Sequence, residues 1–427
     1  IMQVWSGGRI ATMDARSNVP YGLIEDGALA TREDGTIAWV GPRAALPAAI
    51  DTPAGAHRRL DGRLVTPGFV DAHTHAVYAG DRSRDFELRL AGKSYAEIAR
   101  EGGGILSTVR ATRAAGLAQL ERESEKRVEA LADSGVTTVE IKSGYGLDRD
   151  TEIAMLRVAR ALGERCDVGV RTTYLGLHAR PPEFADADGY VDFVIDEMLP
   201  FVARERLADA VDAFCETIAF TRAQVGRFFE AARTFGFEVK LHADQLSEGG
   251  GAALAARYGA LSADHLERAS PEGLAALAAA GTVAVVLPGA TYFLRETARP
   301  PVEAMRRLGI PIAVATDCNP GTSPLVSMPL ALNLACTLLG LTPEEALAGA
   351  TRNGARAVGL GGSAGLLAAG YAADFVVWDL DAPVQLAYAI GAQPVHAIVR
   401  GGRLRRAHGA TAERSESFGR RNVGSVR

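Results

Sequence analysis

Two histidines separated by one residue, His73 and His75, are the clearest candidates for chemistry in this sequence. Residues i and i+2 of a β-strand point the same way, so both imidazole rings can reach one cation. Imidazole nitrogens with one carboxylate, and a position left open for water, form a ligand set typical of catalytic Zn²⁺ or Fe²⁺. A later histidine and a later aspartate complete such a set, and the four predicted metal ligands are His73, His75, His242 and Asp317.

The elements that would bring these residues together are strands alternating with helices. Short apolar runs recur from position 64 onward, separated by stretches with apolar residues three or four apart, such as Leu117–Ser134 and Thr221–Phe235. This alternation predicts a parallel sheet covered by helices, and eight units over roughly 250–300 residues favour an α/β fold of the (β/α)₈ TIM-like barrel type. The predicted barrel strands are Leu64–Val70, Thr137–Ile141, Val168–Thr173, Ala210–Cys215, Glu238–Leu241, Leu261–Ala263, Thr282–Leu287 and Pro311–Ala315.

Both ends of the chain read differently from its middle. Before residue 62, short runs of alternating apolar and polar residues, broken by turn signals, suggest hairpins. The same pattern returns after Gly365, with predicted strands at Ala372–Leu380 and Val395–Arg400. Neither end alone could bury a sufficient core. We therefore expect a small β-sandwich domain built from both termini, residues 1–62 and 365–427, flanking a barrel at 63–364.

Active sites of such barrels lie at the carboxyl ends of the strands. Only eight histidines occur in the sequence, and five of them fall at predicted strand ends: His73, His75, His178, His242 and His265. The other three, His57, His396 and His408, lie in the terminal regions and are expected at the surface.

Composition excludes several other classes of function. With 48% hydrophobic and 23% charged residues, the chain has the profile of a globular protein, and its net charge of −5 with dispersed Lys and Arg argues against nucleic acid as a partner. No apolar run reaches the length of a membrane span, and no signal-peptide pattern opens the sequence. The four cysteines are widely spread, which favours a reducing compartment. A cytoplasmic protein is expected, with the Arg-containing segment 400–427 as a solvated tail.

Several longer motifs in the sequence resemble those of a known enzyme superfamily. The stretch from Pro67 to His75 (PGFVDAHTH) resembles the opening motif of the amidohydrolase superfamily. Narrower matches are HAVYAGDRSRDFELRL from His75, EIKSGYGL from Glu140, KLHADQ from Lys240 and ATDCNPGTS from Ala315. Together they resemble the imidazolonepropionase family along nearly the whole chain. The resemblance implies hydrolysis of 4-imidazolone-5-propanoate to N-formimidoyl-L-glutamate in histidine degradation, with one Zn or Fe ion per subunit and a homodimer.

Chemistry suggests roles for two residues beside the metal. Asp317 can take a proton from the attacking water, and His265 can stabilise an oxyanion or shuttle the proton. Metal ligation and core packing are the alternatives for His265. Many members of the superfamily bridge two metals with a carbamylated Lys at the end of strand four, but the predicted fourth strand ends without a Lys, and Lys142 ends the second. A single metal is therefore expected.

The propionate of the implied substrate calls for a cation. Arg82 is the best candidate, because a guanidinium can hold a carboxylate at two points, although a surface salt bridge to Asp81 or Asp85 is the alternative. Tyr145 and His178 resemble the other substrate contacts of the family. Further donors could come from the turn after Asp317, at Asn319, Gly321 and Thr322. The segment 101–104 (EGGG) is either a hinge over the substrate or a plain connection.

Position 245 separates the remaining alternatives. Related deaminases carry a proton-relaying Glu three residues after the strand-five histidine, whereas this sequence has Gln245, which can hydrogen-bond but cannot titrate. We therefore expect Gln245 to act in the site through its amide, reading the substrate ring. A deaminase of a heterocyclic base is the alternative enzyme. A catalytically silent barrel is the alternative outside enzymes, but it should have lost metal ligands, and none is lost here.

Overall fold

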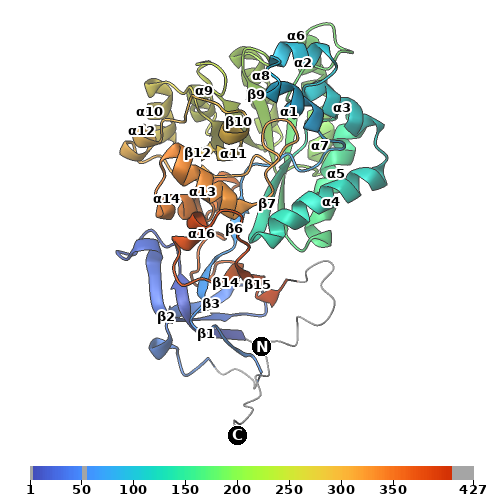
Figure 1. The fold of residues 1–427 in the computed structure, drawn as a ribbon. Coiled ribbons are helices and arrows are strands. Elements are labelled where there is room, and N and C mark those ends of the chain that lie inside the picture. The colour runs from blue at the N-terminus through green and yellow to red at the C-terminus, as the bar shows by residue number, and fades with distance from the viewer. Residues whose placement is uncertain (1–2, 51–54, 406–427) are drawn as a thin grey trace.

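The chain folds into a barrel and a smaller sheet beside it (Figure 1). The computed structural model describes residues 3–50 and 55–405. The predicted (β/α)₈ barrel with a small β domain drawn from both termini is confirmed. Among the helices of the described residues, none combines the length and apolar character needed to cross a membrane. The four cysteines all lie within the described residues and are free thiols.

Eight parallel strands form the barrel, and neighbours in the chain are neighbours in the sheet. Their bounds are β6 (Phe69–Asp71), β7 (Val136–Lys142), β8 (Gly169–Leu177), β9 (Ala210–Cys215), β10 (Glu238–Ala243), β11 (Ser262–His265), β12 (Val283–Val286) and β13 (Ile312–Val314).

The first and last strands of the barrel meet at a seam. A parallel bridge joins Thr74 to Cys318, beyond the ends of β6 and β13. The carboxylate of Asp71 also accepts hydrogen bonds from the backbone N–H (3.0 Å) and the hydroxyl (2.6 Å) of Thr316. The seam therefore closes at the end of the barrel where the predicted metal ligands lie.

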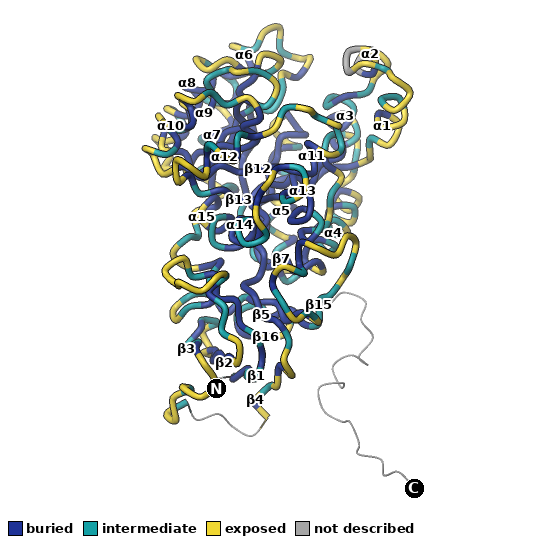
Figure 2. The backbone as a smooth tube through the Cα atoms, turned by 60° about the vertical axis from the view of Figure 1, so that its left-hand side comes forward, coloured by how far each residue is buried: buried dark blue, intermediate teal, exposed yellow. Residues whose placement is uncertain are grey.

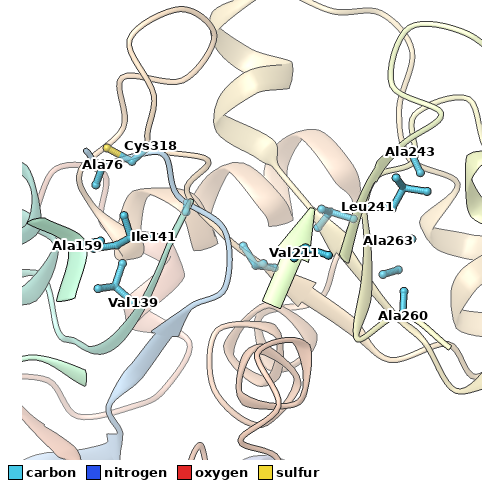
Figure 3. Packing of buried hydrophobic residues seen from close by; sticks show 14 of the residues in the cluster. Ala76, Val139, Ile141, Ala159, Val211, Leu241, Ala243, Ala260, Ala263 and Cys318 are labelled. Carbon is cyan, nitrogen blue, oxygen red and sulfur yellow. The ribbon is translucent and has the colours of Figure 1, made fainter. Parts of the chain in front are cut away.

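Alternation along the strands separates an apolar outer face from a polar inner face. Val139 and Ile141 of β7 lie near Ala159 of α5 (Arg149–Arg165) (Figure 3). The intervening Glu140 and the following Lys142 contact charged groups of other strands inside the barrel. The strand period of two thus buries apolar side chains against the helices and directs polar ones to the interior.

Helices surround the barrel, with exposed outer turns and buried inner faces (Figure 2). The predicted helix at Thr221–Phe235 is α8 (Arg222–Thr234), which Thr221 and Gln224 begin with a capping box. The other helices are α1 (Ser83–Leu90), α2 (Tyr95–Arg100), α3 (Ile105–Ala114), α4 (Leu117–Asp133), α5 (Arg149–Arg165), α6 (Ala187–Phe193), α7 (Leu199–Arg204), α9 (Gly251–Arg257), α10 (Pro271–Ala280), α11 (Pro288–Phe293), α12 (Val302–Arg307), α13 (Met328–Leu339), α14 (Pro343–Gly349), α15 (Arg352–Ala357) and α16 (Gln385–Tyr388).

A mixed sheet from the two ends of the chain packs below the barrel (Figure 1). Trp5, Leu29, Phe375 and Val399 belong to its own buried core. Its strands are β1 (Gln3–Ala11), β2 (Leu23–Thr31), β3 (Ile37–Pro42), β4 (His57–Arg59), β5 (Leu64–Pro67), β14 (Phe375–Trp378), β15 (Val395–Arg400) and β16 (Arg403–Leu404).

The prediction of one opening barrel strand at Leu64–Val70 is wrong. The run is two strands in two sheets, because β5 pairs with β1 and β14 whereas β6 pairs with β7. The chain passes between the sheets at Gly68, where a Cβ atom would lie 2.1 Å from the hydroxyl oxygen of Thr137. A glycine at this point therefore leaves the space that the Thr137 side chain occupies.

The histidines expected at the surface agree with this picture where the structure describes them. His57 is exposed, and His396 is partly exposed and lies 3.1 Å from Asp379. His408 and most of the predicted tail, from residue 406 onward, lie outside the described residues.

Candidate metal centre and substrate cavity

The structure brings the four predicted metal ligands together at the carboxyl end of the barrel. The Nε2 atoms of His73 and His75 are 3.3 Å apart, and those of His75 and His242 are 3.4 Å apart. Oδ1 of Asp317 lies 3.4 Å from Nε2 of both His73 and His75. A tetrahedral metal with bonds of about 2.1 Å requires ligand atoms about 3.4 Å apart, so these spacings fit a metal ion such as zinc.

The outer ring nitrogens of two of these histidines face carboxylates. Nδ1 of His73 hydrogen-bonds to Oδ2 of Asp264 at 2.6 Å, and Nδ1 of His242 lies 3.1 Å from Oδ2 of Asp212. Because a carboxylate only accepts, the His73 bond places the proton on Nδ1 and leaves the Nε2 lone pair free for a metal. Asp212 favours the same tautomer in His242.

A buried network of opposite charges lies beneath the ligands. The Lys142 ammonium is 2.7 Å from Glu140 and 2.9 Å from Asp212, and Lys240 lies 3.7 Å from Glu140. Burial alone would lower the pKa of Lys142, but Asp212 and Glu140 raise it above the usual value, so the ammonium stays charged. The barrel topology also confirms that β9 is the fourth strand and that Lys142 lies on the second.

His265 stands beside the ligand cluster in a strained backbone conformation. It and the following Leu266 have φ values of 82° and 68°, and Asp317 has a φ of 52°. Non-glycine residues adopt this region at a cost, and such strain gathers at functional sites. A ligand atom of His265 also lies within 4.8 Å of ligand atoms of His73 and Asp317. Its assignment to proton chemistry rather than to metal ligation stays a prediction.

Asp317 is fully ionised in this environment. Burial opposes its charged form, but the contacts with His73 and His75 outweigh burial and hold the pKa of Asp317 well below its usual range. The carboxylate can therefore serve as a ligand and as a proton acceptor.

A cavity of about 400 Å³ opens above the ligand cluster. This volume lies within the range of small-molecule sites. Apolar side chains contribute one part of its lining: Ile105, Phe214, Ile218, Leu246 and Leu294. Most of the predicted site residues contribute the rest: His75, Arg82, Tyr145, His178, His242, Gln245, His265, Asp317, Asn319 and Thr322.

Gly321 borders the guanidinium of Arg82. A Cβ atom at this position would lie only 2.3 Å from Nη1 of Arg82, so the glycine leaves the space that the guanidinium occupies. On its other side, Arg82 donates from Nε to Oδ2 of Asp85 at 2.8 Å. The salt bridge considered as an alternative role for Arg82 is therefore present, but Arg82 lines the cavity as well.

Tyr145 and His178 lie on neighbouring loops that one buried glutamate organises. The carboxylate of Glu152 accepts backbone N–H bonds from Gly144 (3.0 Å) and Leu147 (2.9 Å), which fixes the loop carrying Tyr145. Nδ1 of His178 lies 2.9 Å from the carbonyl oxygen of Gly144. A carbonyl only accepts, so Nδ1 carries the proton and Nε2 is left as an acceptor.

The charge states of these two side chains follow from their surroundings. Burial, followed by the neighbouring His75 and His242 rings, lowers the pKa of His178 well below its usual value, so the ring is neutral. Burial raises the pKa of Tyr145, which therefore keeps its phenolic proton. The cavity thus offers a ligand one hydrogen-bond acceptor, Nε2 of His178, and one donor, the hydroxyl of Tyr145.

Gln245 sits on a loop that two further carboxylates hold. Glu216, at the end of β9, accepts from the backbone N–H of Leu246 at 2.9 Å and from the Ser247 hydroxyl. Asp244 accepts from Gly251 at 2.9 Å. Glu152 was not among the sequence candidates, because an acidic residue in the first turn of a helix is ordinary.

The turn after Asp317 is held by its own asparagine. Oδ1 of Asn319 accepts from the backbone N–H of Gly321 (2.9 Å) and Thr322 (2.8 Å), and Nδ2 donates to the carbonyl oxygen of Asp317 at 2.7 Å. The side chain of Asn319 is thus engaged in shaping the turn. Direct contact of Asn319, Gly321 and Thr322 with a substrate stays a prediction.

Comparisons with known proteins agree with this architecture. The model of the amidohydrolase family matches residues 64–405. Among solved structures, a zinc-bound adenosine deaminase from Xanthomonas campestris is similar with a TM-score of 0.71 and 19% identity, covering 94% of this chain and 92% of that one. Guanine deaminase of E. coli has a TM-score of 0.70 and 16% identity, covering 95% and 100%. At such identities these two likenesses bear on the fold alone.

Much closer relatives exist in sequence. An imidazolonepropionase of Ralstonia nicotianae is 58% identical over 402 residues, which cover 93% of this chain and 97% of the relative. An imidazolonepropionase of Shewanella baltica is 54% identical over 403 residues, covering 94% and 98%. These matches confirm the resemblance seen in the motifs. The chain belongs to the amidohydrolase family and, within it, to the imidazolonepropionases.

Proposed function

We propose that this chain hydrolyses the ring amide of 4-imidazolone-5-propanoate to give N-formimidoyl-L-glutamate, using one Zn or Fe ion per subunit. The observation that carries the proposal is a ligand cluster beneath a cavity that Arg82 also lines, in which His75 lies 3.3–3.4 Å from His73, His242 and Asp317. The high identity to imidazolonepropionases over nearly the whole chain supports the choice of substrate.

His73, His75, His242 and Asp317 would hold the metal. A divalent metal in such a site lowers the pKa of water toward ~7 and so supplies hydroxide at neutral pH. Two observations support a single ion: β9 ends without a lysine, and Lys142 is already paired with Glu140 and Asp212. The ligand set suits both Zn and Fe.

The proton chemistry falls to two residues that lie beside one another. Water adds to the ring carbonyl carbon, the ring C–N bond breaks, and the leaving nitrogen must gain a proton. Asp317, ionised and in contact with His73 and His75, takes the proton from the water. His265 stabilises the negative oxygen of the tetrahedral intermediate or passes the proton on to the nitrogen.

The substrate is held by groups of complementary chemistry. The Arg82 guanidinium binds the propionate. Nε2 of His178, an acceptor because Nδ1 donates to Gly144, receives a ring N–H. The Tyr145 hydroxyl and the Gln245 amide contact the polar atoms of the ring. Asn319, Gly321 and Thr322, in the turn after Asp317, supply further contacts.

The proposal extends to the setting of the enzyme. A homodimer in the cytoplasm accords with the resemblance. The expectation of no nucleic-acid partner accords with a net charge of −5 and with Lys and Arg residues that are dispersed along the chain.

Metal content and product together test the proposal. Metal-replete protein should consume imidazolone propionate, seen as loss of the imidazolone absorbance, and should release formimidoylglutamate without ammonia. Protein stripped by a chelator should be inactive until Zn or Fe is restored, and elemental analysis should give one ion per subunit. If the metal-replete protein leaves this substrate untouched, the proposal fails. Release of ammonia from a heterocyclic base would favour the deaminase alternative instead.

A further inference from the structure

Arg82 reaches the cavity from the turn that begins α1, and its guanidinium is confined on two sides. Gly321 borders it on one side, where a Cβ atom would lie 2.3 Å from Nη1. Asp85, one helical turn along α1, accepts from Nε at 2.8 Å on the other. The side chains of Arg82 and Asp85 are only 11% and 10% exposed. This ion pair is therefore largely removed from solvent, unlike an ordinary pair on a helix surface.

Asp85 is itself anchored from a second direction. The same Oδ2 atom accepts the backbone N–H of Gly104 at 2.9 Å. A Cβ atom on Gly103 would lie 2.5 Å from Oδ1, so the glycine-rich segment closes tightly over the carboxylate. The carboxylate thus links the guanidinium to the segment between α2 and α3.

This arrangement determines which atoms of Arg82 remain for a ligand. Nε is engaged by Asp85, so the two terminal nitrogens form the fork that can bind a carboxylate at two points. The net charge of the side chains around this fork also suits a ligand with a single negative charge. Arg89, which approaches the Gly321 carbonyl at 3.5 Å, adds a second guanidinium, so Arg82, Arg89 and Asp85 together carry a net charge of +1.

We infer that Asp85 is a positioning residue for substrate specificity: it holds the Arg82 guanidinium so that the terminal fork faces the carboxylate of the substrate. The inference rests on the proposed function, because it assumes a ligand with a carboxylate beside its ring. Asp85 is not among the residues that line the cavity, and the effect that we infer for it on a ligand carboxylate acts through Arg82.

Calorimetric binding to the metal-replete protein tests the inference without any turnover. Imidazole propionate serves as the probe with a carboxylate, and 4-methylimidazole as the probe without one. Arg82→Met should weaken imidazole propionate by about 10- to 100-fold, the loss of charge-assisted hydrogen bonds. Asp85→Asn should weaken it by about tenfold and should change the binding of 4-methylimidazole by less than about twofold.

A double-mutant cycle separates positioning from a general structural role. Adding Asp85→Asn to Arg82→Met should cause no further loss of imidazole propionate binding, because the group that Asp85 positions is gone. Asp81→Ala is the matched control. It removes the bonds that Asp81 accepts from the Ser83 N–H (2.8 Å) and hydroxyl (2.5 Å) at the start of α1 without touching the guanidinium, and should leave binding unchanged.

Asp85→Glu is a second variant that tests the inference if Asp85→Asn does not fold. It keeps the charge but moves the carboxylate outward by one methylene, and should weaken imidazole propionate binding selectively. Equal loss for both probes, additivity with Arg82→Met, or the same loss in Asp81→Ala would overturn the inference while leaving the proposed function intact. Failure of the wild-type protein to bind imidazole propionate would overturn both.

Discussion

The space at Gly321 gives a quantitative test of where Arg82 lies. In Gly321→Ala, the new Cβ would stand 2.3 Å from Nη1 and 2.8 Å from Cζ of Arg82, whereas an unstrained contact needs about 3.5 Å. Gly321 is not among the residues with positive φ, so the substitution adds no backbone strain of that kind. The guanidinium must therefore retreat by roughly 1 Å, which also disturbs its bond to Asp85.

The expected cost follows from the bonds that the retreat breaks. A hydrogen bond to a charged group contributes about 1.5–3 kcal/mol, which corresponds to roughly a 10- to 150-fold loss in kcat/KM. The carboxylate of the propionate takes no part in the bond changes at the ring carbonyl, so its contact with Arg82 is about equal in the ground and transition states. We therefore expect KM to rise while kcat changes little. Initial rates of imidazolone loss over a range of substrate concentrations measure both constants.

Two further variants make the result decisive. Gly362→Ala is the control, because no atom lies within 4 Å of its added Cβ, and it should behave as wild type. In an Arg82→Lys background the planar fork is absent, so Gly321→Ala should cost less than about twofold. A wild-type KM in Gly321→Ala, or the same cost in both backgrounds, would refute the placement of Arg82 against this glycine.

Three other outcomes are expected. His265→Ala should lower kcat by at least about 100-fold while elemental analysis still finds the metal; loss of the metal would make His265 a ligand. Removing the metal with a chelator should lower the melting temperature, since a ligand at a thousandfold excess over its Kd stabilises the folded state by about 4 kcal/mol; an unchanged melting temperature would contradict a metal site in the buried cluster. For Glu216, burial acts to raise the pKa, but the bonds from Ser247 and the neighbouring backbone lower it from the usual 4.5. The stabilising contribution of the Glu216 carboxylate is therefore present above pH 4.5 and is lost as the pH falls through the lowered pKa. The difference in unfolding free energy between wild type and Glu216→Gln should therefore shrink on acidification. A difference that does not change with pH would contradict this role of Glu216.

The barrel could be predicted because local residue patterns distinguish its strands from its helices. Apolar residues recur with a period of two in the strands and near 3.6 in the helices. β9 of the barrel and β15 of the terminal sheet begin and end at the predicted residues. Strand ends of a parallel barrel share one face, so His73, His242 and Asp317 could be grouped although they are far apart in the chain. The division of Leu64–Val70 between two sheets was missed, because the apolar run continues through it and only the pairing partners distinguish β5 from β6.

The residues that hold the site in place were harder to find. Asp85 lies three residues after Arg82, which in sequence is indistinguishable from a solvent-exposed pair on a helix. Glu152 folds back onto a loop whose shape depends on positive φ at Gly144 and Leu147. Such contacts depend on the path of irregular backbone, which periodicity does not encode.

The seam between the first and last barrel strands has a consequence for how the enzyme is made. His73 and His75 leave the ribosome early, whereas Asp317 and its neighbour Thr316, which bonds Asp71 across the seam, follow some 240 residues later. At about 5–20 residues per second, a nascent chain holds only part of the ligand set for roughly 10–50 s. Cations met during that interval find an incomplete site, so the full ligand set can select among metals only after Asp317 has been synthesised and has joined the three histidines.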